Sequence, residues 1–431
     1  MREMKDSGVE WIGEIPADWN VGKTLYALSM PITDGPHETP ELFEEGIPFV
    51  SAEAVSCGNG HIDFEHIRGF ISQDFYDECC KKYIPEMHDI YMIKSGATTG
   101  KVAKVETEIL FTIWSPLAVF RTNPKKCFYE YLYYFIQSDA YQKQIENKWT
   151  YGTQQNIGMR TLEKLMICFP SIDQQMNIAG YLDVKCSKID EIIEKQLSII
   201  EKLKEYKLSI ITEAVTSGIN PDVEMKDSGS VWFGSIPINW QMNRLKYVFH
   251  IQKDIAGEEG HTVLSITQRG IIPKDFSNNE GQFANSYANY QLVHKGDFAM
   301  NHMDLLTGWV DISKYEGVTS PDYRVFVLND KNGMCPEYYL YMMQMCYSAR
   351  IFYGLGQGVS GMGRWRLQAD KFLNFHIPIP PYDEQKIIAD YITDKVNYIE
   401  VEIDKRNKLI EKYQEYKKSL IYEVVTGKKE V

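Results

Sequence analysis

Apolar residues recur every three or four positions along two long stretches of the chain, a spacing typical of amphipathic α-helices. The first stretch covers residues 173–215, and the second begins 210 residues later. Polar residues interrupt both stretches at equivalent places, where Gln196 corresponds to Arg406 and Lys207 to Lys417. Two unrelated surface helices would not share their interruptions, so we predict two helices that pair with each other within the chain.

The apolar positions of each stretch form a seam along one side of the predicted helix. About 43 residues at ~1.5 Å each give a rod of roughly 60 Å. Two such rods can bury their seams against each other as an antiparallel coiled coil. The predicted seam residues are Leu182, Ile189, Ile193, Ile200, Leu203 and Ile210 in the first helix, and Ile392, Ile399, Ile403, Ile410, Tyr413 and Leu420 in the second.

A shorter repeat lies at residues 4–19 and 225–240, where ten of sixteen positions are identical. The Ser-Gly and Ile-Pro pairs in each copy disfavour a long helix. Two tryptophans in each copy provide large apolar anchors; they are Trp11 and Trp19, and Trp232 and Trp240. We therefore predict that each copy is a structured loop, termed a clip, that attaches to the helical pair.

Between each clip and the following helix lies a segment with short strand-like runs and turn residues between them. The two segments are diverged copies, because Asp89–Met92 corresponds to Asp297–Met300 at an offset of 208. In the first we expect strands at Ile47–Ser51, Ile90–Ile93, Val102–Val105 and Leu117–Phe120 and a helix over Phe128–Ser138. In the second we expect strands at Thr262–Ile266, Phe298–Asn301, Trp309–Ile312 and Arg324–Val327 and a helix near Glu337–Tyr347.

The predicted fold class is α+β, with two α/β globules separated by two long helices packed as an antiparallel coiled coil. A repeat unit of about 210 residues favours a pseudo-twofold arrangement, because solenoids are built from much shorter repeats. The predicted segments are a clip at 1–20, a globule at 21–170, a helix at 171–218, a clip at 219–241, a globule at 242–380 and a helix at 381–431.

Composition is that of an ordinary globular chain, with 44% hydrophobic and 24% charged residues over 431 positions. The sequence has no run of 18 apolar residues and no signal-peptide pattern at its start, so we expect a cytoplasmic protein without a membrane span. The eight cysteines form no CxxC pair, which argues against a disulfide framework or a zinc site. A net charge of −13 implies that, if DNA is bound, other subunits supply part of the phosphate contacts.

Four fragments resemble catalytic motifs but lack the residues that the chemistry needs. Gly96–Lys101 is one residue short of a phosphate-binding loop, and Gly356–Gly361 follows no predicted strand. Pro380-Pro381-Tyr382 has Ile379 where an amino-methyltransferase needs Asn or Asp, and Glu224–Lys226 repeats a stretch of the first clip. No paired carboxylates and no Ser/His/Asp or Cys/His set can be assembled, so we expect no catalytic residues and no metal site.

The order of clip, globule and helix, written twice, resembles the specificity subunit of type I restriction–modification systems. The clips read KDSGxxWxGxIPxxW, and both long helices begin with PxxDxQ. In the first globule, Thr33–Pro40 is similar to a frequent opening of target recognition domains in that family. The stretch from His88 to Lys101 is similar to the family's GD…SG…GK pattern. The second globule departs from both, since it lacks the DGxH opening and has Asp304 in place of the first glycine.

The resemblance implies a non-catalytic subunit that reads DNA. Each globule would recognise one half of a bipartite target in double-stranded DNA, and the helices would set the spacer between the halves. Methyltransferase subunits, two of them, would dock on the helices and bind S-adenosylmethionine, while this chain would bind no cofactor. A restriction subunit with translocase activity would join the assembly.

Direct readout of bases requires polar side chains that reach the edges of base pairs. In the first globule the candidates for DNA binding are His37, Thr39, Lys94, Ser95, Thr98, Thr99, Lys101, Gln154, Gln155, Asn156 and Arg160. In the second they are Gln268, Arg269, Asn301, His302, Gln357, Ser360, Arg364 and Arg366. Trp365 fits either stacking on a base or packing in the core.

Two alternatives remain open at the level of sequence. One is a two-domain scaffold for protein partners that binds no DNA, which predicts no salt-dependent affinity for duplex DNA. The other is an active DNA methyltransferase, which requires a cofactor site that the motifs above do not support.

Overall fold

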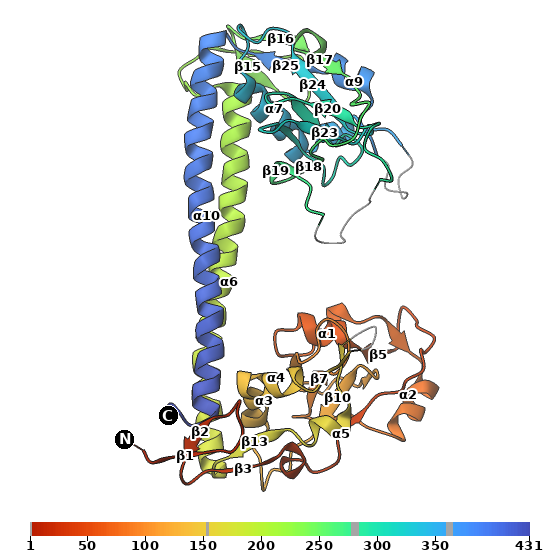
Figure 1. Ribbon diagram of the computed structural model, residues 1–431, viewed down its shortest axis with the longest axis vertical. Helices are drawn as coiled ribbons and strands as arrows, with labels where there is room; N and C mark the ends of the chain where they lie inside the picture. Colours follow the sequence, from red (N-terminus) through yellow and green to blue (C-terminus); the bar gives the residue numbers. More distant parts are fainter. Residues whose placement is uncertain (1, 152–154, 277–283, 359–364) are drawn as a thin grey trace. The chain divides into compact units, whose positions relative to one another are not determined.

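The structure is a computed structural model that describes residues 2–151, 155–276, 284–358 and 365–431 (Figure 1). The chain divides into two compact units, Met1–Gln196 with Asn407–Val431 and Leu197–Arg406. The division cuts both long helices partway along their length. Each unit therefore contains one clip, one globule and a portion of each helix. The six sequence segments proposed above keep the status of predictions.

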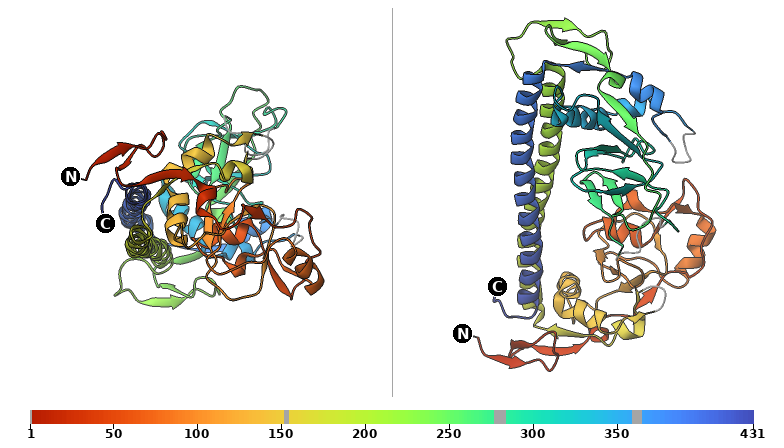
Figure 2. Two further views of the ribbon diagram at one scale, coloured as in Figure 1. Left: turned by 90° about the horizontal axis from the view of Figure 1, so that it is seen from below. Right: turned by 45° about the horizontal axis from the view of Figure 1, so that its top comes forward.

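The two long helices are α6 (Ile172–Ser217) and α10 (Tyr382–Val425). Within each unit the helix portions run antiparallel, and they stay side by side in the views of Figures 1 and 2. The predicted pairing of the helices is thus confirmed. The pseudo-twofold relation of the halves stays a prediction from the repeat.

Local sequence explains where the long helices begin and end. Ser171 and Gln174 form a capping box at the start of α6, because the Ser171 Oγ accepts from the Gln174 N–H and the Gln174 side chain accepts from the Ser171 N–H. Helix α6 ends directly before Gly218 and α10 ends two residues before Gly427, and the φ angles of these glycines are +78° and +73°. Glycine adopts this left-handed conformation at little cost, which terminates each helix.

The predicted seam residues lie on the inner sides of the helices. Leu182, Ile189, Ile200 and Ile210 are buried in α6, as are Ile392, Ile399, Ile410 and Leu420 in α10. The remaining four, Ile193, Leu203, Ile403 and Tyr413, are half-buried. Cys186 is also buried in the seam, where its thiol packs as a small apolar group.

The interruption formed by Lys207 and Lys417 makes ion pairs across the helical pair. In the first unit the Lys417 ammonium lies 2.7 Å from the Asp190 carboxylate. In the second unit Lys207 pairs with Glu400. Both members of the second pair stand at an offset of 210 from their counterparts in the first, so the repeat includes the ion pair as well as the seam.

The first globule is built on the antiparallel sheet β4-β10-β7-β8. Its strands are β4 (Thr33–Asp34), β7 (Ile90–Ile93), β8 (Val102–Lys104) and β10 (Leu117–Phe120). Outside this sheet lie β3 (Asn20–Lys23), β5 (Ile47–Val50), β6 (Phe70–Ile71), β9 (Thr112–Ile113), β11 (Thr150–Tyr151), β12 (Gln155–Asn156) and β13 (Met166–Phe169). The helices are α1 (Ala52–Cys57), α2 (Gln73–Cys80), α3 (Tyr129–Gln137), α4 (Asp139–Glu146) and α5 (Met159–Leu162).

Both faces of this sheet are covered. Alternate residues of a strand point to opposite faces, and accordingly Ile90 and Met92 join the core that contains α3 and the helical pair. Tyr91 and Ile93 join a second core with Ala54 and Val55 of α1. Burial of a large apolar side chain contributes about 1.5–3 kcal/mol, so the two faces together hold the sheet in place.

The second globule repeats this plan with the sheet β17-β24-β21-β22. These strands are β17 (Phe249–Gln252), β21 (Phe298–Met300), β22 (Val310–Ile312) and β24 (Arg324–Leu328). The other strands are β16 (Gln241–Arg244), β18 (Leu264–Thr267), β19 (Gly270–Pro273), β20 (Gln291–Val293), β23 (Gly317–Thr319) and β25 (His376–Ile379). The helices are α7 (Pro336–Ser348), α8 (Ile351–Gly354) and α9 (Ala369–Asn374).

The same hydrogen bonds attach each globule to the ends of the helices. Gln175 and Gln385 are buried, and their side chains accept from the N–H groups of Phe128 (2.8 Å) and Cys335 (3.0 Å). Each also donates back to the proline five residues before it. This contact gives the predicted PxxDxQ start of each helix a structural role.

One tyrosine of each globule, from α3 in the first and from α7 in the second, completes the attachment. The Tyr131 hydroxyl lies 3.2 Å from the carbonyl of Val425 at the end of α10. The Tyr338 hydroxyl lies 3.3 Å from the carbonyl of Val215 at the end of α6. Each globule is therefore fixed to the start of one long helix and to the end of the other.

Each clip is a two-stranded hairpin rather than an irregular loop. The strands are β1 (Met4–Asp6) with β2 (Glu14–Pro16), and β14 (Met225–Asp227) with β15 (Ser235–Pro237). Trp19 and Trp240 are buried as predicted, whereas Trp232 is 42% exposed and is not a buried anchor. The first clip is held by the Tyr422 hydroxyl, which donates to the carbonyl of Ile12 at 3.2 Å.

The predicted strands and helices are confirmed where the apolar pattern was strong. Strands β7 and β10 have the predicted bounds, and β21, β22 and β24 differ from theirs by one residue. The short helices α1, α2, α4, α5, α8 and α9 were not predicted. No helix among the described residues is long and apolar enough to cross a membrane.

Candidate nucleic-acid interface

Most candidate residues of the first globule gather around the turn between β7 and β8. Lys94, Ser95, Thr98, Thr99 and Lys101 lie on this turn, whose glycines Gly96 and Gly100 have φ angles of +99° and +94°. The turn leads directly into β8 and not into a helix, so it lacks the architecture of a phosphate-binding loop.

The short hairpin β11–β12 lies next to this turn. Ser95 and Asn156 form an antiparallel bridge, and the Gly96 N–H donates to the carbonyl of Gln155 at 3.0 Å. The turn and the hairpin thus present Ser95, Gln155 and Asn156 together, although they are distant in sequence. Gln154 lies outside the described residues.

A buried carboxylate lies beneath this surface. The Asp34 side chain is only 1% exposed, and its carboxylate lies close to two lysine ammonium groups and one histidine ring. Lys94 Nζ is 3.2 Å and His37 Nε2 is 3.3 Å from Asp34 Oδ2, and Lys82 pairs with Oδ1. We call these four residues the Asp34 node. Burial alone would raise the pKa of Asp34, but the ammonium groups of Lys82 and Lys94 lower it below its usual value.

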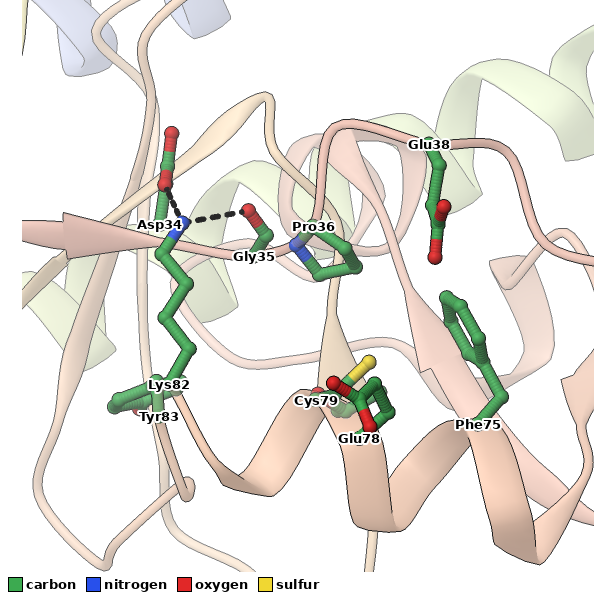
Figure 3. A pocket seen from close by; sticks show the side chains of 10 residues that line it. Asp34, Gly35, Pro36, Glu38, Phe75, Glu78, Cys79, Lys82 and Tyr83 are labelled. Atoms are coloured by element: carbon green, nitrogen blue, oxygen red, sulfur yellow. Dashed lines mark hydrogen bonds and ion pairs between the residues drawn. The ribbon is translucent and has the colours of Figure 1, made fainter.

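Figure 3 shows how Lys82 reaches the node from the end of α2. Its ammonium contacts both Asp34 and the carbonyl of Gly35, the latter at 3.1 Å. A Cβ on Gly35 would lie 2.0 Å from the carbonyl oxygen of Ile113, so only glycine permits this close backbone approach. A cavity of about 110 Å³ separates the loop that contains Gly35 from Phe75 and Cys79 of α2.

The remaining candidates of the first globule differ in accessibility. His37, Thr39, Lys101 and Arg160 are exposed, whereas Lys94 is only 13% exposed. The Lys101 ammonium lies 3.3 Å from the carbonyl of Ser56 at the end of α1. Exposed side chains can reach a ligand directly, while Lys94 is committed mainly to Asp34.

In the second globule, the turn at 301–309 between β21 and β22 occupies the equivalent place. The Asn301 side chain accepts from the Met303 N–H at 3.2 Å and so shapes the turn. The exposed Gln268 approaches the carbonyl of Thr307 at 3.4 Å, which brings the β18–β19 turn with Arg269 to the same region. Leu306 is 58% exposed on this turn.

His302 faces inward and does not present a charged group. Burial, together with the positive charges of Arg324, Arg366 and Lys253, lowers the pKa of His302 to about 3. Its imidazole is therefore neutral at pH 7. The carbonyl of His302 accepts from the Leu367 N–H at 3.0 Å, so a role in positioning the chain fits this residue better than a contact to DNA.

The last group of candidates, at residues 357–366, lies partly outside the described residues. Gln357 and Arg366 are exposed and form an antiparallel bridge through their main chains, while Ser360 and Arg364 lie outside the described residues. Trp365 packs against Tyr353 and donates to its carbonyl at 2.8 Å. This contact favours the core-packing interpretation of Trp365.

Sequence reasoning missed two buried charges that organise these surfaces. Asp34 was noted only as part of a motif, and Lys82 was not singled out. In the second globule Arg324 is 4% exposed, donates to the carbonyl of Leu367 at 2.8 Å and lies over the Phe372 ring at 5.0 Å. Burial lowers the pKa of Arg324 to about 10. The sequence did contain a signal for this buried charge, because Arg324 is a charged residue within the predicted strand Arg324–Val327.

Within the described residues, no group of three His, Cys, Asp or Glu side chains is arranged to hold a metal ion. Pro380 and Pro381 precede the first turn of α10, and Glu224–Lys226 runs into strand β14 of the second clip. Both fragments therefore have the structural roles that the sequence suggested.

Comparison with known proteins gives matches over most of the chain. The family model of the type I restriction modification DNA specificity domain matches residues 36–202 and 237–412. The type I restriction enzyme MjaVIII specificity subunit of Methanocaldococcus jannaschii is 24% identical over 389 residues, which cover 85% of each chain. The putative MjaX specificity subunit of the same organism is 26% identical over 434 residues, covering 97% of this chain and 95% of that protein.

A solved structure has the same fold. It comes from work on complex assembly and conformational transition of the type I R-M system, and it matches with a TM-score of 0.69. The match covers 95% of this chain and 98% of the other, at 12% identity. At this identity the likeness concerns the fold alone.

Proposed function

The chain belongs to the type I restriction–modification DNA specificity family, and we propose that each of its two globules reads one half of a bipartite DNA target. The chain is a subunit that recognises a DNA target, because the family model matches it twice in tandem. The observation that carries the proposal is the repeated framework with different turns, 94–101 in one globule and 301–309 in the other. A scaffold that binds only protein partners is not favoured.

For the first globule, we propose that DNA lies against the 94–101 turn and the adjacent β11–β12 hairpin. The exposed side chains of His37, Thr39, Lys101, Asn156 and Arg160 support this choice, since polar groups must reach base edges or phosphates. Ser95, Thr98, Thr99 and Gln155 line the same turn and hairpin and complete the surface.

For the second globule, we propose that the reading surface includes Gln268 and Arg269 of the β18–β19 turn, Asn301, and the pair Gln357 and Arg366. Gln268 and Arg269 are exposed, and arginine and glutamine are suited to bidentate contacts with guanine and adenine. Gln154, Ser360 and Arg364 lie outside the described residues and stay candidates for DNA binding from the sequence.

DNA and methyltransferase subunits are the partners of this chain. We propose that two methyltransferase subunits dock on the helical pair and bind S-adenosylmethionine, that a restriction subunit with translocase activity joins them, and that this chain itself performs no chemistry. Calorimetry with S-adenosylmethionine on the isolated chain tests the last point. Binding with a stoichiometry of one would contradict it and favour an active methyltransferase.

We further propose that the paired helices determine the spacer between the half-sites. Removing one heptad from α6 and one from α10 preserves the seam and shortens each rod by about 10 Å. This length corresponds to at most roughly three base-pair steps of ~3.4 Å. Both half-sites are expected to persist with a shorter spacer, and an unchanged spacer would contradict the proposal.

Methylation sequencing of a host that expresses this chain with its cognate methyltransferase tests the whole proposal. We expect one modified motif made of two specified parts with an unspecified spacer. Modification at a continuous motif would contradict the two-reader arrangement. No sequence-specific modification, in a host where the complex assembles, would contradict the role in target recognition.

A further inference from the structure

We propose that Asp34 is a positioning residue that holds two lysine ammonium groups beneath the DNA-reading surface of the first globule and keeps them away from DNA phosphates. This inference rests on the proposed function and adds a role for residues that do not contact bases. Its central feature is one buried carboxylate that contacts Lys82 and Lys94 of two other segments and His37 of the loop that directly follows it.

The geometry makes Asp34 a junction. It lies at the end of β4, opposite Ala118 of β10. Lys82 comes from the end of α2 and Lys94 from the end of β7, while His37 belongs to the loop that follows Asp34. The loop, the helix end and the reading turn are therefore tied to one side chain.

Lys94 links the node to the reading surface through its main chain. Its N–H donates to the carbonyl of Pro116 at 2.8 Å, and its carbonyl accepts from the Ile157 N–H at 2.9 Å. The neighbouring Ser95 bridges to Asn156. A shift of Lys94 would consequently move the turn against the hairpin that carries Gln155 and Asn156.

The charges of the node explain its expected effect on DNA affinity. Two ammonium groups share one carboxylate that is 1% exposed. Without that negative charge they would repel each other at short range, because the interaction between charges is strong where water is excluded. Lys82 is already 47% exposed and can turn to solvent. Released lysines would contact phosphates without regard to sequence.

The second globule provides an internal comparison. Met300 pairs with Arg324 on its sheet as Met92 pairs with Ala118 on the first. The buried charge at this level of the sheet is thus an arginine in the second globule and Asp34 in the first. Among the described residues, no carboxylate pairs with Arg324. Loss of Asp34 should therefore affect only the half-site read by the first globule.

The test compares Asp34→Asn with the wild-type complex on duplexes that carry the methylated motif, and on duplexes altered in either half. We expect non-cognate affinity to rise and the slope of log affinity against log salt to steepen by up to about two, since each phosphate contact adds about 0.9. Discrimination at the first half-site should fall at least roughly tenfold, as for loss of one base contact. Discrimination at the second half-site should not change.

Asp18→Asn is the matched control. It removes the same charge from a 57% exposed carboxylate that pairs with Arg2 within the first clip, and it should alter neither the salt slope nor either half-site. If Asp34→Asn leaves both the salt slope and discrimination at the first half-site at wild-type values, the inference is wrong.

Circular dichroism and thermal unfolding show whether Asp34→Asn folds. If it does not, a second variant tests the inference. Lys94→Met removes the link between node and turn without releasing a cation. It should weaken discrimination at the first half-site without steepening the salt slope, and unchanged discrimination would overturn the inference. A wild-type complex that discriminates at neither half-site would instead overturn the proposed function.

Discussion

The two globules share their attachment to the helices and differ in the charges buried near the turns at 94–101 and 301–309. Gln175 and Gln385 make the same bonds, and Tyr131 and Tyr338 reach the ends of opposite helices. Away from the helices, Asp34 binds two lysines in one globule, whereas Arg324 is buried without a carboxylate partner among the described residues of the other. The comparison separates a constant framework from surfaces that vary.

The largest expected effect tests whether the framework is the same in both halves. Gln175→Met and Gln385→Met each leave buried N–H and carbonyl groups without partners, and one such group costs about 1–3 kcal/mol. We expect each variant to lower the free energy of unfolding of its own unit by about 2–4 kcal/mol, as measured by hydrogen exchange.

The same substitution at the exposed Gln414 of α10 serves as the control and should cost under about 0.5 kcal/mol. A large effect of Gln175→Met combined with a negligible one of Gln385→Met would show that the two attachments are not equivalent. The common framework would then be incorrect.

A pH titration sharpens the difference between the buried charges. The pKa of His302 is about 3 in the folded chain, against about 6.5 when unfolded, so its contribution to stability is present above pH 6.5 and is lost as pH falls. At pH 5 the loss amounts to about 2 kcal/mol. The pKa of Asp34 is lowered below its usual value, so its contribution is lost only below about pH 4.

Hydrogen-exchange rates are compared at pH 7 and pH 5 after correction for the pH dependence of exchange in an unstructured chain. The corrected rates should therefore rise in β21 and β22 but not in β7 and β8. His302→Gln should remove most of this response. Equal responses of the two sheets, or a response that persists in His302→Gln, would show that the lowered pKa of His302 does not cause the pH dependence.

The smallest expected effect concerns the repeated ion pairs of the helices. Lys417 and Asp190 are partly exposed, and pairs of this kind contribute about 0.2–1 kcal/mol. Lys417→Gln and Lys207→Gln should each lower stability by about 0.5 kcal/mol, and less at high salt. A salt-independent loss above about 2 kcal/mol in thermal unfolding would indicate a role other than ion pairing.

The framework could be predicted from sequence because its signals are periodic and repeated. The seam from Leu182 to Ile210 follows from helical spacing, and strands β7 and β10 follow from short apolar runs between turns. The short helix α2 was missed, since eight residues that include four acidic or amide side chains give no clear apolar face.

Which candidate residues lie together could be predicted only in part, because their proximity depends on contacts between distant segments. The proximity of Ser95 to Asn156, and of Lys82 to Asp34, arises from the path of the chain and leaves no local pattern. His302 differs from these residues, since nothing in the sequence indicates that its Nδ1 is buried, or that burial and nearby positive charges lower its pKa.

Exchange of one globule tests the central claim most directly. Residues 21–170 are replaced by the equivalent globule of another family member, and the methylated motif is determined by sequencing with the same methyltransferase. The account predicts a new first half, with the second half and the spacer unchanged. A change in both halves, or an unchanged motif in an assembled complex, would contradict independent reading by the two globules.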